Sequence, residues 1–200
     1  FAVLTSLGGT GLTLSEGNLE AYFASSTNEP TGSTIRFSSG KWYFEVVPLI
    51  DGDESGIGVV NPVTGDNYDY FGQLARLYSY INGVSSYISY GATYTTGDII
   101  GVSYDADTGD LEYYKNGVSQ GVASTIFAGQ EIAFRVAERS GTGAVSSVAN
   151  FGQDSSFAGN KTRQGNTDAN GIGDFYYTPP TGYLALCTEN TGGNPIADIT

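Results

Sequence analysis

Residues 97–121 encode two consecutive β-hairpins, and this segment constrains the fold more than any other. Apolar residues alternate with small or polar ones from Ile100 to Tyr104, the period of two that is typical of a half-buried strand. A polar stretch containing Gly109 supplies the first turn, since glycine tolerates a positive φ. Asn116-Gly117 is the strongest two-residue signal for a type I′ hairpin turn. The chain is therefore expected to build antiparallel sheets.

A second strong strand is expected over residues 40–47. Its alternation places Trp42, Phe44 and Val46 on one face and the intervening residues on the other. Trp42 is the only tryptophan, and we interpret it as a core residue rather than a platform for a ligand. Another Asn-Gly pair, Asn82-Gly83, lies between two tyrosine-rich runs and predicts a further hairpin.

Composition agrees with one large all-β domain. The 200 residues include 29 glycines and 15 tyrosines and no methionine, which favours strands and tight turns over helices. No apolar run approaches the roughly 20 residues that a membrane-spanning helix needs, so no membrane insertion is expected. Phe1 is not a translation start, so we expect the chain to be a fragment of a longer or processed product.

Charge and the rarest residue types exclude several classes of function. The net charge is −13, from 21 acidic and 8 basic residues, so a nucleic-acid partner is not expected. The chain has no histidine, which excludes Ser-His-Asp and Cys-His catalytic groups and a Cys/His zinc site. Its one cysteine, Cys187, lies in an apolar run and is interpreted as a small buried hydrophobic residue.

Four motifs, in order, resemble the signature of the SPRY domain. They are SSGKWYFEV at 38–46, GIGVV at 56–60, the GDIIGVSYD…LEYYKNG pattern within 97–121, and NFGQ at 150–153. The resemblance implies a concanavalin-like, jelly-roll β-sandwich of two antiparallel sheets that is used for binding rather than for chemistry. It predicts one domain over 1–188, with a polar surface insert at 158–175 and a C-terminal tail or linker at 189–200.

Segments near the two ends of the chain indicate which group of SPRY-like modules the chain resembles most. FAVLTSL at 1–7, LTLSEGNLEAYF at 12–23 and the closing TPPTGYLALCTEN at 178–190 are similar to SPRY-like modules of structural and tail proteins in tailed bacteriophages. The resemblance implies a non-enzymatic virion structural, decoration or fibre module that attaches to other virion proteins or to a host-surface glycan or protein. Its localisation would be the virion, in many copies or as a homo-oligomer. Multiple copies would add avidity.

Two loops are the candidate binding sites. The stretch 61–72 combines turn-forming residues with aromatic ones, and tyrosine offers a flat ring and a polar tip to a sugar or a protein partner. An acidic loop at 51–55 is a second candidate. The candidate residues are Asp66, Asn67, Tyr68, Tyr70 and Phe71 in the first loop and Asp53 and Glu54 in the second. Packing of tyrosines across a sheet and a solvated acidic surface are the competing interpretations.

The acidic residues Asp105, Asp107 and Asp110 do not predict a metal site. An EF-hand loop needs acids at positions one, three and five and glycine at six, whereas Gly109 here stands at position five. We interpret the segment as a hairpin turn.

Catalysis is not expected either. The acidic strand of the form ExDxxE that some concanavalin-like glycosidases use is missing from the sequence. No catalytic residue, metal or cofactor is predicted. The alternatives to the phage module are a carbohydrate-binding, lectin-like domain and an intracellular SPRY adaptor that binds peptides.

Overall fold

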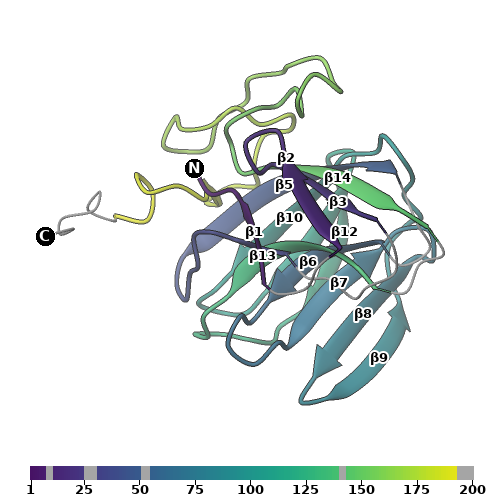
Figure 1. The fold of residues 1–200 in the computed structure, drawn as a ribbon. Helices are drawn as coiled ribbons and strands as arrows, with labels where there is room; N and C mark the ends of the chain where they lie inside the picture. Colours follow the sequence, from purple (N-terminus) through teal and green to yellow (C-terminus); the bar gives the residue numbers. More distant parts are fainter. Residues whose placement is uncertain (8–10, 25–30, 51–54, 140–142, 193–200) are drawn as a thin grey trace, which may run out of the picture.

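The computed structural model describes residues 1–7, 11–24, 31–50, 55–139 and 143–192, and every helix or strand assigned in these ranges is a β-strand (Figure 1). None of these described residues forms a helix that could cross a membrane. The strands are β1 (Leu4–Ser6), β2 (Leu12–Ser15), β3 (Glu20–Phe23), β4 (Thr31–Ser33), β5 (Lys41–Ile50), β6 (Ser55–Val60), β7 (Asn67–Phe71), β8 (Arg76–Ile81), β9 (Val84–Ser89), β10 (Ile100–Asp105), β11 (Leu111–Lys115), β12 (Val118–Ser124), β13 (Ala133–Glu138), β14 (Val145–Asn150) and β15 (Leu184–Ala185).

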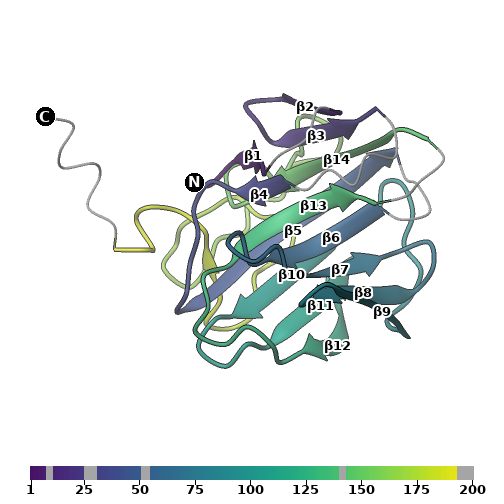
Figure 2. The same ribbon diagram turned by 60° about the horizontal axis from the view of Figure 1, so that its bottom comes forward.

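The strands form two large sheets packed face to face (Figure 2). The larger sheet has the order β12-β11-β10-β5-β14-β3-β2, with β15 paired to β5 beyond the end of β14. The smaller sheet has the order β13-β6-β7-β8-β9, and β1 pairs with β4. Among the strands of the described residues, every pair is antiparallel except β15 with β5. The predicted antiparallel β-sandwich is confirmed.

The main core lies between the two sheets, and the predicted alternation in β5 supplies part of it. Trp42, Phe44 and Val46 all belong to this core and are at most 5% exposed. The Phe44 ring stacks on Phe134 of the opposite sheet with ring centroids 4.4 Å apart. Burying such rings between two sheets stabilises each by about 1.5–3 kcal/mol. The core role that we predicted for Trp42 is confirmed.

The predicted turns close the hairpins as expected. Asn116 and Gly117 have φ values of 49° and 78°, and the flanking Lys115 and Val118 pair directly. The same two-residue geometry joins β8 to β9, where both turn residues also have positive φ. In the turn between β10 and β11, Asp105 Oδ1 accepts the backbone N–H groups of residues 107 and 108. The interpretation of this acidic stretch as a hairpin turn is confirmed.

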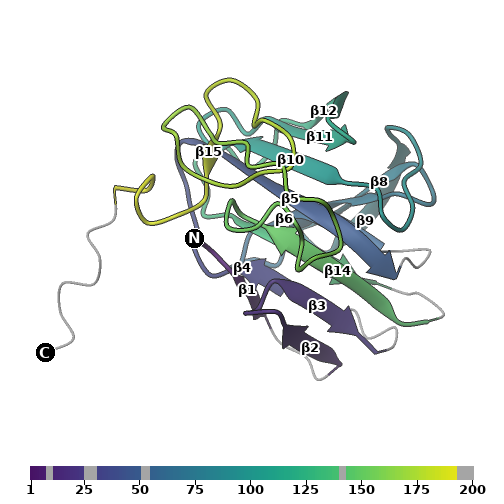
Figure 3. The ribbon, with the colours of Figure 1, turned by 90° about the horizontal axis from the view of Figure 1, so that it is seen from above.

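A third layer covers the outer face of the larger sheet around β5, β10 and β14. Segment 152–187, drawn in green to yellow, loops across these strands (Figure 3). Phe157 and Phe175 from this segment are fully buried. They pack on Val47 and Tyr43, respectively, which point away from the main core. Cys187 is 3% exposed in the same layer, so its predicted burial is confirmed.

The predicted polar insert at 158–175 belongs to this third layer. It contains no strand, as expected for a loop, but it is anchored by buried carboxylates. Asp168 is 6% exposed and accepts the backbone N–H groups of Asn170, Ile172 and Ala185. The insert is therefore a cover for the sheet as well as a surface loop. The division into a domain at 1–188 and a tail at 189–200 stays a prediction.

Glu45 fastens the third layer to the sheet. Its carboxylate is fully buried and accepts the backbone N–H groups of Tyr176 and Tyr177, each at 2.8 Å. Tyr43 Oη and Asn150 Nδ2 donate to the same carboxylate at 3.2 and 3.4 Å. Burial raises the pKa of the Glu45 carboxyl to about 7, although these four hydrogen bonds oppose the shift.

Candidate functional site

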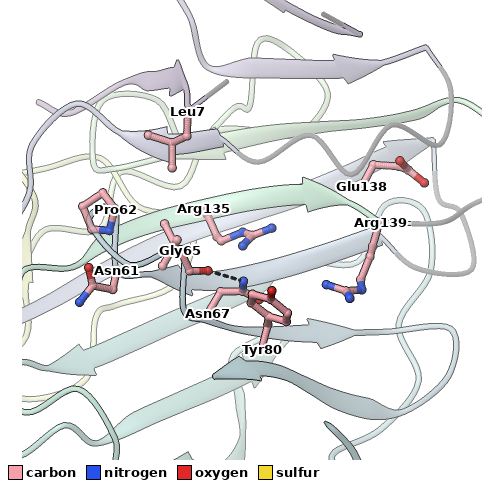
Figure 4. Close-up of a pocket in the computed structure, with 10 residues that line it drawn as sticks. Leu7, Asn61, Pro62, Gly65, Asn67, Tyr80, Arg135, Glu138 and Arg139 are labelled. Atoms are coloured by element: carbon pink, nitrogen blue, oxygen red, sulfur yellow. Dashed lines mark hydrogen bonds between the residues drawn. The ribbon is translucent and has the colours of Figure 1, made fainter. Parts of the chain in front are cut away.

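A pocket of about 440 Å³ with a mixed polar and apolar lining lies on the outer face of the smaller sheet (Figure 4). We call it the Asn67 pocket. It is formed where the β6–β7 turn, β7, β8 and the end of β13 meet, and Leu7 closes one side of it. The lining residues are Leu7, Val60, Asn61, Pro62, Gly65, Asn67, Tyr80, Arg135, Glu138 and Arg139. Its volume falls in the range of about 300–1,000 Å³ that is usual for small-molecule sites.

The sheet register explains why these side chains meet. Asn67 on β7 pairs directly with Tyr80 on β8, so both side chains stand on one face of the sheet. Arg135 on β13 pairs with Gly58, which in turn pairs with Asp69 on β7. Because Gly58 has no side chain, the Arg135 and Asp69 side chains meet beside it. A Cβ atom at Gly58 would lie 1.8 Å from the Tyr68 carbonyl oxygen, so only glycine fits there.

Arg135, which lines the pocket, belongs to a buried ion pair. Arg135 Nε lies 3.3 Å from Asp69 Oδ1, and the two side chains are 9% and 1% exposed. Burial raises the pKa of the Asp69 carboxyl, and the positive charges of Arg135 and Arg139 oppose the rise. Removing one partner of such a buried pair typically costs about 3–5 kcal/mol. The pair therefore fixes the guanidinium of Arg135 in one position.

A second guanidinium forms the wall of the pocket. The Cζ atom of Arg139 lies 3.7 Å from the centroid of the Tyr78 ring, and Arg139 Nη2 donates to Ser85 Oγ at 3.3 Å. The Tyr80 ring lies between Asn67 and Arg139 in Figure 4, with its centroid 6.0 Å from the Arg139 Cζ atom. Cation–π contact and a hydrogen bond together hold Arg139 in place.

Asn67, which lines the pocket, has a buried side-chain oxygen without a hydrogen-bond partner among the described residues. The residue is 6% exposed, and its Nδ2 donates to the Gly65 carbonyl at 2.9 Å. Within the described part of the chain, its buried Oδ1 has no hydrogen-bond donor. A buried acceptor without a donor costs about 1–3 kcal/mol.

The structure brings only part of the predicted site into the pocket. Asn67 lines it, and the β6–β7 turn contributes residues on one side. Asp66 has a structural role instead, since its Oδ1 accepts the backbone N–H of Asn82 at 2.8 Å. Tyr68 faces the main core, where its ring packs edge-on against Phe127. The acidic candidates Asp53 and Glu54 lie outside the described residues.

Tyr70 and Phe71 correct the prediction of a binding loop over 61–72. Residues 67–71 form strand β7, and both aromatic side chains are fully buried. Tyr70 packs in the main core and donates its hydroxyl to the Ala92 carbonyl, whereas Phe71 stacks on Tyr78. Neither ring is available to a ligand in this structure. The binding-loop interpretation failed because a polar residue, Asp69, interrupts the apolar pattern of the strand, and its partner is 66 positions away at Arg135.

Comparison with known families decides the classification. The family model of the SPRY domain matches residues 41–154, more than half of the chain. The chain belongs to the SPRY family. SPRY domains are binding modules that generally mediate protein–protein interactions. The predicted family is confirmed, whereas the similarity to phage proteins stays a prediction. A comparison with curated protein sequences found no match.

Solved structures agree with the SPRY fold. The SPRY domain of human HERC1 superposes with a TM-score of 0.58 at 13% identity, covering 70% of this chain and 92% of that one. The PSpry domain of TRIM65 gives 0.54 at 14% identity, with 74% and 90% covered. The carbohydrate-binding module CBM66 from Bacillus subtilis gives 0.51 at 13% identity, with 73% and 91% covered. At these identities the similarity shows the fold alone.

Two of the residues that sequence reasoning missed, Arg135 and its partner Asp69, share one signal. Arg135 is flanked by apolar residues on both sides in β13, and Asp69 is flanked by two tyrosines in β7. A charged residue inside an otherwise apolar strand is rarely fully buried unless it is paired. The two charges could therefore have been matched to each other, which would have indicated the position of Arg135 on the outer face of the sheet.

Proposed function

We propose that this SPRY domain is a non-enzymatic binding module that holds its partner in the Asn67 pocket. The observation that carries the proposal is the pocket itself, a concavity of about 440 Å³ whose lining brings together Arg135, Arg139 and Tyr80. Binding sites are concave and hold a few well-placed polar groups that fix the orientation of the ligand. The two guanidinium groups and the Tyr80 hydroxyl supply such groups here.

The charge distribution supports the same location. The chain has only eight lysine and arginine residues, and two of them line this pocket. Arginine and tyrosine are enriched among the residues that dominate binding free energy at protein interfaces. Binding as the general role of SPRY domains agrees with this arrangement.

The proposal is tested by screening the protein against two ligand libraries, one of glycans and one of peptides. The full chain is applied to a glycan array and to a library of displayed peptides, in parallel with the Arg139→Ala variant. We expect ligands that bind the wild-type chain at least tenfold more tightly than the variant. Arg76→Ala is the matched control, because Arg76 stacks near Tyr87 on the same sheet but outside the pocket. Ligands that bind both variants as tightly as the wild type would place the site elsewhere.

For the biological setting we propose a tailed-bacteriophage particle, in which the domain serves as a structural, decoration or fibre module. The support is the resemblance of segments 1–23 and 178–190 to phage SPRY-like modules. In that setting many copies would act together, so a modest affinity per pocket would suffice for attachment. Neighbouring capsid or tail genes, and detection of the protein in purified particles by mass spectrometry, are the expected findings. A gene encoding an attached ubiquitin-ligase domain would contradict the phage setting.

A further inference from the structure

Strand β9 is an edge strand with an open side. Among the described strands it is the last of the smaller sheet, and it pairs only with β8. All six of its residues are exposed, and the β8–β9 hairpin projects at the lower right of Figure 1. Such an edge presents a row of backbone N–H and C=O groups to which another strand can bind.

The hairpin geometry shows which backbone groups of β9 point outward. The residues that flank its two-residue turn form a hydrogen-bonded pair, so Val84 and the other even-numbered residues point their backbone groups toward β8. The Tyr90 N–H donates to the Ala75 carbonyl at 2.9 Å, which agrees with this alternation. The backbone groups of Ser85 and Tyr87 therefore point to the open side.

The other edges of the two large sheets are protected among the described residues. Thr31 covers the edge of β13, since its hydroxyl donates to the Val136 carbonyl at 2.7 Å and accepts the Val136 N–H at 3.1 Å. Strand β12 has two register shifts against β11, and β2 has only four residues. Proteins commonly use bulges, short strands and charges to prevent pairing at an edge. Strand β9 instead keeps a regular register with β8 along its whole length.

The hairpin that contains β9 is also uncharged, in a strongly acidic chain. No acidic or basic residue occurs from Leu77 to Gly97, which is the longest uncharged stretch of the sequence. Two copies of a chain with a net charge of −13 repel each other over most of their surfaces. Pairing through β9 would set no like charges opposite each other. This edge is therefore a place where a second copy can approach.

Two apolar side chains of β9 lie on the inner face of the smaller sheet without being covered. Ile88 pairs with the core residue Leu77, so Ile88 and Val84 share the face that forms the core elsewhere in the sheet. Val84 and Ile88 are nevertheless 67% and 53% exposed. Apolar area that stays in water here would be buried by a further strand on the same sheet.

We propose that β9 pairs with β9 of a second copy of this chain, antiparallel and about a two-fold axis at Ser86. Ser85 of each copy then forms a hydrogen-bonded pair with Tyr87 of the other, which uses the outward backbone groups. On the inner face Val84 of each copy meets Ile88 of the other. An axis at either neighbouring residue would instead place Val84 or Ile88 opposite Ser86. The self-match of apolar side chains selects the register and favours a second copy over an unrelated strand.

The dimer has a consequence for the Asn67 pocket, and this consequence alone rests on the proposed function. A two-fold axis between antiparallel edge strands stands perpendicular to the sheet, so the outer faces of both smaller sheets point the same way. Each of these faces carries one Asn67 pocket. A dimer therefore presents two pockets to one surface, and such bivalency raises the apparent affinity without any new contact.

Sedimentation equilibrium of the full chain is the first test. At about 100 μM chain we expect a mass close to twice that of the monomer. Ile88→Lys should raise the dissociation constant at least about tenfold, because it sets a charge against an apolar side chain twice in each dimer. The matched control is Val122→Lys, at a side chain that is 56% exposed on the edge strand β12, and it should dimerise like the wild type.

Oxidative crosslinking tests the register. On the two-fold axis the two copies of Ser86 form a non-hydrogen-bonded pair with Cα atoms about 4.5 Å apart, within reach of a disulfide. Ser86→Cys should therefore form a covalent dimer under mild oxidation. Ser89→Cys, at an exposed position on the same strand but away from the axis, should stay uncrosslinked. The native Cys187 is 3% exposed and is common to both variants.

Several results would overturn the inference. They are a chain that stays monomeric at about 100 μM, a dimer that Ile88→Lys leaves intact, and equal crosslinking of the Ser86→Cys and Ser89→Cys variants. Assemblies larger than a dimer would also overturn it, because a two-fold pair leaves no open β9 edge. A monomer that binds an extended peptide at β9 would show that the edge serves another protein. The pocket is tested separately with Arg139→Ala, so failure of the dimer leaves the proposed function standing.

Discussion

Four hydrogen-bond donors converge on one carboxylate at Glu45, which makes this residue the most consequential ionisable group outside the pocket. Its folded-state pKa of about 7 lies above the ordinary value of 4.5 because the carboxyl group is buried. A carboxyl group with a raised folded-state pKa holds its proton more tightly in the folded chain than in the unfolded chain. Its contribution to stability is complete below pH 4.5 and is lost as the pH rises through 7.

Glu45→Gln should remove this pH dependence. In the wild type, the Glu45 contribution to the free energy of unfolding should fall by about 3 kcal/mol between pH 4.5 and 7. The variant should lack this fall, because an amide does not titrate. Urea unfolding of both proteins between pH 4.5 and 7 gives the free energy of unfolding of each. The other carboxyl groups titrate in both proteins, so their contribution cancels when the variant is subtracted from the wild type. Equal slopes for the two proteins would contradict the prediction.

At the scale of elements, the two Asn-Gly turns have the same local conformation but different surroundings. Gly117 in the β11–β12 turn has a φ of 78°, and a Cβ atom there would lie 2.8 Å from the Tyr177 ring of the third layer. Gly83 in the β8–β9 turn has a φ of 81°, and a Cβ atom there would have no neighbour within 4 Å. Comparing alanine substitutions at these two glycines therefore separates two free-energy costs. One is the backbone cost of a positive φ for alanine, and the other is the cost of crowding the third layer.

Gly83→Ala should destabilise the protein by about 1 kcal/mol, the backbone cost of a positive φ. Gly117→Ala should cost about 1–3 kcal/mol more, because it also crowds the Tyr177 ring. Chemical denaturation of the two variants gives the comparison directly. Equal destabilisation of the two variants would mean that the Tyr177 ring moves away from the new methyl group at no measurable cost.

The sequence predicted elements far better than it predicted the site. Alternation identified both faces of β5, and Asn-Gly pairs identified two turns, because these signals are local and repeat within a few residues. The pocket joins Asn67, Tyr80 and Arg135, which come from three strands whose order in the sheet no local pattern specifies. Burial of Tyr70 was missed for a related reason, since tyrosine serves equally well in a core and at a binding surface.

At the scale of the whole molecule, the SPRY match and the third layer divide the chain near residue 154. The family model ends there, whereas the segment that covers the outer face of the larger sheet continues to residue 187. Without that segment Glu45 would lose the two backbone donors of Tyr176 and Tyr177. The apolar side chains of Tyr43 and Val47 would lose their cover as well.

A chain shortened to residues 1–154 should therefore fail to form a stable monomer. We expect an unfolding transition that is much less cooperative than that of the full chain, together with binding of a hydrophobic dye such as ANS. Calorimetry and dye fluorescence on both chains provide the test. A sharp transition at an unchanged Tm would show that the third layer is dispensable for the sandwich.

The contact between Glu45 and residues 176 and 177 also affects when the protein can complete its fold during translation. These partners are separated by 131 and 132 positions. A ribosome that adds about 5–20 residues per second therefore needs at least several seconds to deliver the donors after the acceptor has emerged. During that interval the outer face of β5, the central strand of the larger sheet, is not yet covered by the third layer. Nascent chains that meet through this exposed apolar face would aggregate. The speed of translation and the supply of chaperones should therefore determine how much protein reaches the native state.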